Sequence, residues 1–167
     1  MRAVFVAAFI CVAFVPVSAQ AAAELDYSRV IITLTMDARH CLCLPKPSCC
    51  PEYSASVTEN GTVIYNGLRG TKVQGEKVHS VPVSVVRDLV SEFFRINFFS
   101  LQDRYESKKH PNGTTETISH ASAATMTIDI DGKRKSIYIF YGAPDDLTAL
   151  QNKLLEALQI SQYVGNK

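Results

Sequence analysis

The 167-residue sequence has almost no excess of charge of either sign, because Lys and Arg together number 17 and Asp and Glu number 16. With a formal net charge of only +1, no strong long-range field draws the protein to nucleic acid or to an anionic membrane surface. We therefore expect no nucleic-acid partner. A chain of this length is typical of one domain, since single domains commonly run to about 100–200 residues. Its 47% hydrophobic content predicts a packed core.

Familiar catalytic motifs are also missing. The sequence contains no H-E-x-x-H, G-x-S-x-G, P-loop or G-x-G-x-x-G pattern. An enzyme needs a nucleophile, an acid–base pair or a metal held in one place, and the four histidines are scattered along the chain. The most site-like cluster is Asp103-Arg104-Tyr105, which we interpret as a salt-bridged cap beneath the last hairpin. We therefore expect a protein that is not an enzyme and that carries no cofactor.

No apolar run reaches the roughly 20 residues that a membrane-spanning helix needs. The run Ala3–Val15 follows the positive charge of Arg2, and small residues lie after it, up to Ala19. This order is typical of a secretory signal peptide. We therefore predict a signal peptide over residues 1–19 and a single mature domain over residues 25–163. The protein would be exported, periplasmic or secreted, with no permanent membrane anchor.

Export changes the interpretation of the cysteines. Cys11 lies in the predicted signal peptide, and the other four are clustered at Cys41, Cys43, Cys49 and Cys50. In an oxidising compartment, an even and clustered set of cysteines favours a structural disulfide framework. A bridge between the adjacent Cys49 and Cys50 would close a strained ring. We therefore expect two disulfides, each joining one cysteine of the first pair to one of the second, with the connectivity left open.

Two other hypotheses apply to the same segment. The four cysteines, with His40, could hold copper or zinc, because soft sulfur ligands suit these metals. Paired cysteines beside prolines could also form a reducible bond that exchanges with other thiols. The first hypothesis lacks the C-x₂-C spacing of common zinc modules, and the second lacks a C-x-x-C motif that opens a helix. We therefore rank both below structural disulfides.

Alternation of apolar and polar residues predicts the strands of a sheet. Arg29–Met36 alternates with a period of two, which indicates a strand with one wholly apolar face. Glycines divide Thr71–Val81 into one or two shorter strands. Ala124–Ile130 and Lys133–Tyr141 flank Asp131-Gly132 and are predicted to form a hairpin with a two-residue turn.

A second hairpin is predicted around an Asn-Gly pair. Tyr53–Thr58 and Thr62–Asn66 flank Glu59-Asn60-Gly61, and Asn-Gly is a strong hairpin signal because both residues tolerate positive φ. A two-residue loop at this point would place Val57 opposite Ile64.

Two segments have the periodicity of amphipathic helices. Apolar residues recur at spacings of three and four over Val83–Phe94, and leucines do so over Leu147–Leu158. The polar stretch 102–119 is predicted to be a surface loop. Hairpins dominate and no βαβ crossover recurs, so the predicted class is α+β, an antiparallel β-sheet of hairpins with two amphipathic helices packed on it.

Three sequence blocks resemble a known family. Cys50–Gly67, Phe98–Tyr105 and Tyr141–Leu147 are similar to the C-P-x-Y-x-V-x-I…D-G-x-V-x-Y-x-G, F-F-x-L-x-D-x-Y and Y-x-G-A-P-x-x-L blocks of a bacterial exported family, the domain of unknown function numbered 6438. The resemblance covers roughly Val30–Leu158. It implies a fold and an exported location, and it implies no activity.

The expected architecture leaves one face or edge of the sheet free, and such a surface suits a partner. We therefore expect a non-catalytic binding or structural module of the cell envelope, whose partner is an envelope protein or a cell-wall component. A copper- or zinc-binding protein ranks second, and a thiol–disulfide enzyme ranks third.

Overall fold

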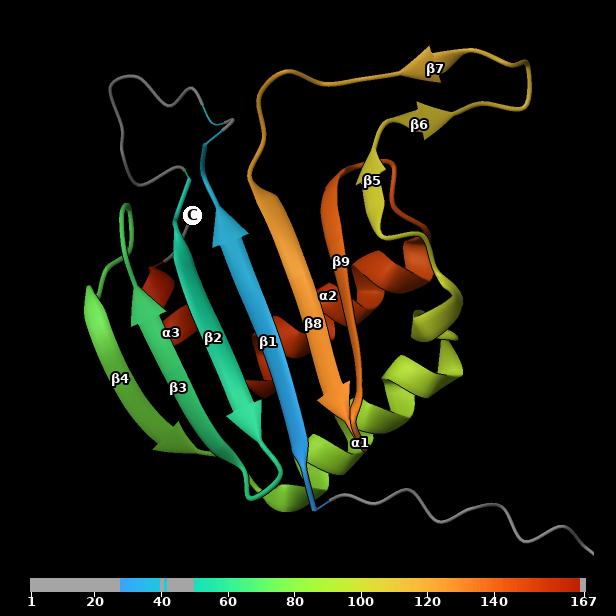
Figure 1. Cartoon of the computed structure of the whole chain (residues 1–167). Helices are drawn as coiled ribbons and strands as arrows, with labels where there is room; N and C mark the ends of the chain where they lie inside the picture. Colours follow the sequence, from blue (N-terminus) through green and yellow to red (C-terminus); the bar gives the residue numbers. More distant parts are fainter. Residues whose placement is uncertain (1–27, 40, 42–49, 166–167) are drawn as a thin grey trace, which may run out of the picture.

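The computed structural model describes residues 28–39, 41 and 50–165. These residues form a seven-stranded sheet in the order β4-β3-β2-β1-β8-β9-β5, together with a separate small hairpin of β6 and β7 (Figure 1). The predicted signal peptide, residues 1–19, lies outside the described residues.

The elements follow one another as strands, a helix, further strands and two helices. The strands are β1 (Val30–Asp37), β2 (Tyr53–Thr58), β3 (Thr62–Gly67), β4 (Gly75–Ser80), β5 (Arg104–Glu106), β6 (Lys108–Lys109), β7 (Thr115–Glu116), β8 (Ala123–Ile130) and β9 (Lys133–Tyr141). The helices are α1 (Val83–Arg95), the 3₁₀ turn η2 (Phe98–Ser100), α2 (Asp145–Ala157) and α3 (Ser161–Val164). The predicted α+β class, with a mostly antiparallel sheet and two main helices, is confirmed.

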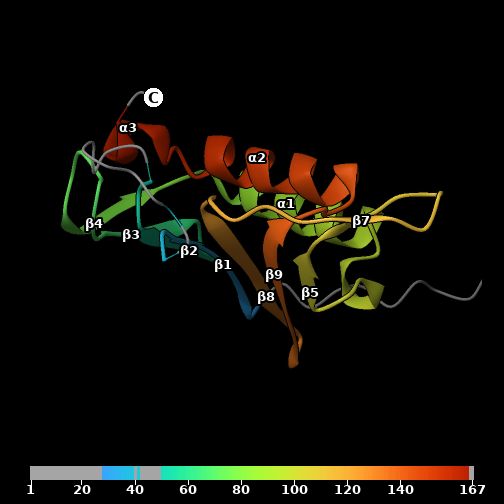
Figure 2. The same ribbon diagram turned by 90° about the horizontal axis from the view of Figure 1, so that it is seen from above.

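The two long helices cover one face of the sheet and leave the other face without helices (Figure 2). The side chains of β1 alternate between buried and exposed because only one face of the sheet is covered by helices. Val30, Ile32 and Leu34 point to the helices and are fully buried, whereas Ile31 between them is 47% exposed. The core therefore lies between one face of the sheet and the two helices.

The buried stripe of α1 is narrower than its apolar sequence predicts. The stripe consists of Val86, Leu89, Val90 and Phe93. Phe94, expected on the same face, is 40% exposed, and its ring packs at 5.8 Å from the ring of Phe99, beside the stripe. Val83, in the first turn, is 43% exposed. These two residues belong to the apolar pattern of the helix in the sequence, but neither is buried in the structure.

The first hairpin has a different register from the predicted one. Its loop holds three residues, 59–61, so that Val57 lies opposite Val63 and not opposite Ile64. The loop ends at Gly61, whose φ is 83° and whose N–H donates to the carbonyl of Thr58 at 2.9 Å. A shift of one residue exchanges the two faces of a strand. Val63 is therefore buried, and Ile64 is 38% exposed.

The prediction of a surface loop over residues 102–119 is wrong in part. This stretch contains β5, which pairs in parallel with β9 and places Tyr105 opposite Ile139. It also contains the small β6–β7 hairpin. Strands of two or three residues are too short to show a period in the sequence.

Candidate functional site

A cavity of about 560 Å³ lies at the end of the sheet where β1 ends and β8 begins. We call it the disulfide cavity. Its walls come from segments that are far apart in the sequence: the end of β1, the chain before β2 and β8, and the helices α2 and α3. The lining residues are Met36, Cys41, Cys50, Pro51, Tyr53, Ala121, Ser122, Gln151, Asn152, Leu155, Ile160, Ser161, Val164 and Gly165.

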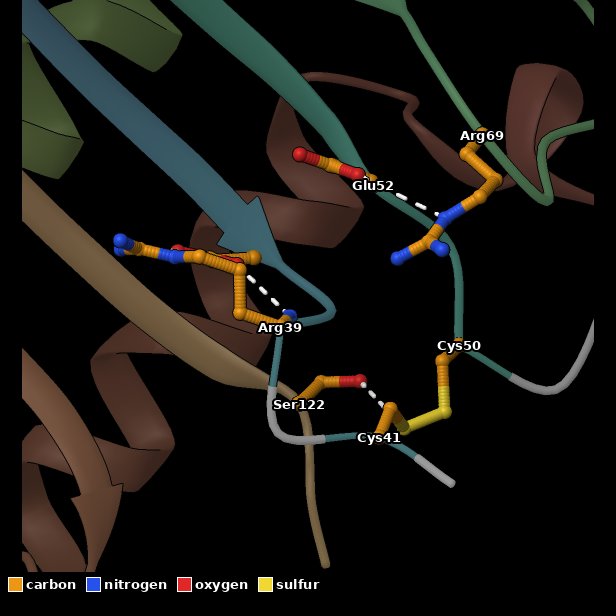
Figure 3. The surroundings of a disulfide bond; sticks show 7 residues. Arg39, Cys41, Cys50, Glu52, Arg69 and Ser122 are labelled. Carbon is orange, nitrogen blue, oxygen red and sulfur yellow. Dashed lines mark hydrogen bonds and ion pairs between the residues drawn. A yellow bond between two sulfur atoms is a disulfide. The ribbon is translucent and has the colours of Figure 1, made fainter. Parts of the chain in front are cut away.

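A disulfide between Cys41 and Cys50 forms part of the cavity wall (Figure 3). Their Cα atoms are 6.2 Å apart, which is within the usual range for a disulfide. The bond links the chain after β1 to the chain before β2. The Sγ of Cys41 lies 3.8 Å from the Oγ of Ser122, in the segment that leads into β8. This bond is one of the connectivities that the sequence left open, and Cys43 and Cys49 lie outside the described residues.

The lining of the disulfide cavity contains no charged side chain among the described residues. Charged residues next to the disulfide pair with each other outside the lining. Arg69 lies 3.7 Å from the carboxylate of Glu52 (Figure 3). Arg39 pairs with Asp37. Burial raises the pKa of the Tyr53 phenol above its ordinary value, and the neighbouring Tyr65 contributes in the same direction. The described part of the cavity wall is therefore uncharged at neutral pH.

Apolar side chains make up much of the wall, with a few hydroxyl and amide groups between them. Ser122 and Gln151 are partly buried, and the side-chain amide of Gln151 lies 3.9 Å from the sulfur of Met36. Concave sites for small ligands typically combine apolar walls with a small number of placed polar groups. The disulfide cavity fits this description.

A second cavity of about 410 Å³ adjoins the first, with which it shares the lining residues Ser122 and Gln151, and we refer to the two together as the groove along α2. Its lining includes Tyr141 at the end of β9. Among the described lining residues, the charged ones, Lys108 and Asp145, belong to this second part. The polarity of the groove therefore increases away from the disulfide.

α3 is attached to the sheet by a histidine and two tyrosines. The Nε2 of His79 on β4 lies 3.2 Å from the carbonyl oxygen of Leu158, and its Nδ1 lies 3.1 Å from the hydroxyl of Tyr163 on α3. The ring of Tyr163 stacks on that of Tyr65, with 4.7 Å between the ring centres. The N–H of Val73 also donates to the carbonyl of Tyr163 at 2.9 Å. These contacts hold one wall of the disulfide cavity in place.

Of the candidate residues named from the sequence, Cys41 and Cys50 line the groove, whereas Asp103, Arg104 and Tyr105 do not. Asp103 pairs with Lys135, and Arg104 lies 2.6 Å from Glu106 and 4.4 Å from the centre of the Tyr138 ring. These contacts agree with the interpretation of this cluster as a salt-bridged cap.

No group of three or more His, Cys, Asp or Glu side chains suited to a metal occurs within the described part of the chain. His40 and two of the four cysteines lie outside that part. A metal site that uses all four thiolates would require the Cys41–Cys50 bond to be reduced. The contributions of α2 and α3 to the cavity could not be predicted from the sequence, because nothing in their local pattern marks a cavity wall.

The Glu116 carboxylate joins the β6–β7 hairpin to β9 at the far end of the groove. A hydrogen bond from Tyr141 holds the pKa of Glu116 below its ordinary value of 4.5, and a second from His110, at 3.0 Å, acts in the same direction. A depressed folded-state pKa stabilises the fold above the unfolded-state pKa, and this contribution is lost as the pH falls through the folded-state value.

Acidification to below pH 4.5 should therefore weaken the attachment of the hairpin. An NMR titration of Glu116 should show its pKa rising in Tyr141→Phe. The pKa of Glu116 should stay unchanged in Tyr138→Phe, which removes a phenolic hydroxyl group from the same strand. Equal pKa values in both variants would contradict this assignment.

A family model described as Domain of unknown function (DUF6438) matches residues 48–158. The chain belongs to this family. The matched region includes Cys50 and the whole of α2, which line the disulfide cavity, and leaves β1 outside. No curated protein shows significant sequence similarity to the chain.

Among the described residues, none of the helices is long and apolar enough to cross a membrane.

Proposed function

We propose that this protein acts, after export, as a non-catalytic module that binds an uncharged group in the disulfide cavity. The group would belong to an envelope protein or a cell-wall component. The observation that carries the proposal is the cavity lining, in which no described side chain is charged. A charged ligand would lose its hydration there without gaining an ionic partner from the described residues. A largely apolar group that carries amide or hydroxyl groups would match both the apolar and the polar side chains of the lining.

The size of the cavity supports this proposal. Ligand sites commonly enclose about 300–1,000 Å³, and the disulfide cavity has about 560 Å³. Its walls are also held in place before binding, by the Cys41–Cys50 bond on one side and by the contacts of Tyr163 on the other. A preformed site spends little binding free energy on ordering its own side chains.

The chemistry of the lining favours binding over catalysis. The described lining contains two serines, Ser122 and Ser161. A serine acts as a nucleophile only when an adjacent base activates its hydroxyl group. The described lining supplies neither histidine nor a carboxylate for that role. This is why we rank a binding module above an enzyme.

Export is the second part of the proposal, and it rests on the signal-peptide pattern around Ala3–Val15. An oxidising compartment would also preserve the Cys41–Cys50 bond. Fractionation of the source cells should find a shortened protein outside the cytoplasm. Recovery of an exported protein that retains Met1 would contradict the predicted cleavage.

Two dyes that differ in charge test the preference for an uncharged group. The uncharged dye Nile red should bind saturably, with a gain in fluorescence. Anilinonaphthalene sulfonate, an aromatic anion, should bind at least about tenfold more weakly, because its sulfonate finds no cation in the described lining. Stronger binding of the anion, or no saturable binding of Nile red, would contradict the proposal.

A further inference from the structure

The strand β4 forms one edge of the sheet (Figure 1). All of its residues are exposed except His79, which is partly buried. It pairs with β3 along its whole length without a register shift and contains no proline. Within the described part of the chain, no other strand pairs with its outer side. Bulges, prolines and charged side chains are common ways in which proteins discourage the pairing of an edge strand; β4 has no bulge or proline, and its charged side chains are Glu76 and Lys77.

The outer side of β4 carries main-chain groups that point away from β3. The N–H of Val81, directly after the strand, donates to the carbonyl of Gly61 at 2.9 Å and therefore points to the β3 side. Main-chain groups alternate along an antiparallel strand. The N–H and C=O groups of Glu76, Val78 and Ser80 consequently point outward, where a further strand could pair with them.

An apolar ridge accompanies this edge on the face that the helices leave open. Val78 is 59% exposed, the highest value among the large apolar side chains that are described. It lies directly opposite Ile64 on β3, which is 38% exposed. Exposed apolar side chains along an unpaired edge indicate a site of strand pairing.

We propose that β4 pairs antiparallel with β4 of a second copy, about a two-fold axis at Val78. The two Val78 side chains would lie opposite each other, flanked by Ile64 of each copy. Glu76 would face Ser80 of the second copy, and Lys77 would face His79 of the second copy. The outward N–H and C=O groups would then meet their counterparts, and the two sheets would become one continuous sheet with the helices on the same side.

Other two-fold registers are less favourable for this sequence. An axis at Lys77 would place two lysines opposite each other, and an axis at Glu76 would do the same with two glutamates. Like charges directly opposite each other destabilise a strand pair. An axis at His79 would bring Glu76 opposite Pro82, which has no N–H to donate. The register centred on Val78 avoids all three faults.

This association does not use the disulfide cavity, because no residue of β4 lines that cavity. The contacts of His79 with Leu158 and Tyr163 lie on the helix side of the sheet, away from the outward main-chain groups. Pairing of six residues from each copy is small compared with stable interfaces, which bury about 1,200–2,000 Å². We therefore expect a weak dimer, with a dissociation constant between about 10 µM and about 1 mM.

Sedimentation analysis of the purified protein over that concentration range should show the mean mass rising from monomer towards dimer. Amide hydrogen exchange at Glu76, Val78 and Ser80 should slow as the concentration rises, because these N–H groups would become hydrogen-bonded. Val78→Lys should abolish both effects by placing two ammonium groups at the axis. Ile31→Lys places a lysine at another exposed apolar position on the face without helices, away from β4, and should leave both effects intact.

A protein that remains monomeric up to about 1 mM would overturn the proposal. The same holds if Val78→Lys and Ile31→Lys associate equally, or if exchange at the three amides is independent of concentration. The wild-type measurements decide the question even if a variant fails to fold.

Discussion

Replacing Phe93 by alanine should lower the free energy of unfolding by about 3–5 kcal/mol. The Phe93 ring is fully buried between α1 and the sheet, and it makes an edge-to-face contact with Phe98 at 4.7 Å between ring centres. The substitution removes this buried ring and leaves a cavity that its neighbours fill only in part. Urea denaturation of the wild-type protein and the variant measures the difference.

The next residue provides a matched control. Phe94→Ala removes the same atoms from a side chain that is 40% exposed, so its cost should stay below about 1 kcal/mol. Similar losses in Phe93→Ala and Phe94→Ala would mean that the buried face of α1 is wrongly assigned.

Removal of the Cys41–Cys50 bond should lower the free energy of unfolding by about 2–3 kcal/mol. The bond closes a loop with a sequence separation of only 9 residues, so the chain entropy that it removes from the unfolded state is at the lower end of the usual range. The double variant Cys41→Ser/Cys50→Ser, compared with the wild-type protein in urea, measures the loss. An unchanged midpoint would contradict a stabilising bond.

Alkylation followed by intact mass measurement tests the complete cysteine assignment. Without reductant, the exported protein should have no alkylated thiol, because two disulfides are expected. The double variant Cys43→Ser/Cys49→Ser serves as the control and should still protect Cys41 and Cys50. Four free thiols together with stoichiometric copper or zinc would favour the metal-binding alternative.

The two hairpins show how far a turn sequence determines the register. Asp131 and Gly132 both adopt positive φ, 51° and 69°, and the predicted two-residue turn is present, with Met126 opposite Ile137. In the first hairpin only the glycine of the Asn-Gly pair has positive φ, and the loop has three residues. Both pairs end in glycine, so the sequence alone does not distinguish the two turn types.

The disulfide cavity could not be predicted in the same way. Its walls combine Met36, Ser122 and Leu155, which only the completed fold brings together. α3 adds further lining residues, and a helix of four residues is too short to show a helical period. The clustered cysteines were recognisable as candidates for disulfides, but local patterning carries no information about their place on a cavity wall.

The most direct measurement compares Nile red binding to two alanine-to-tryptophan variants. Ala121 lines the disulfide cavity, whereas Ala149 is exposed on α2 and lines neither part of the groove. If the cavity is the binding site, Ala121→Trp should fill it and weaken binding at least about tenfold, while Ala149→Trp should bind like the wild-type protein. Wild-type affinity in Ala121→Trp, or equal losses in both variants, would contradict a binding site in the disulfide cavity.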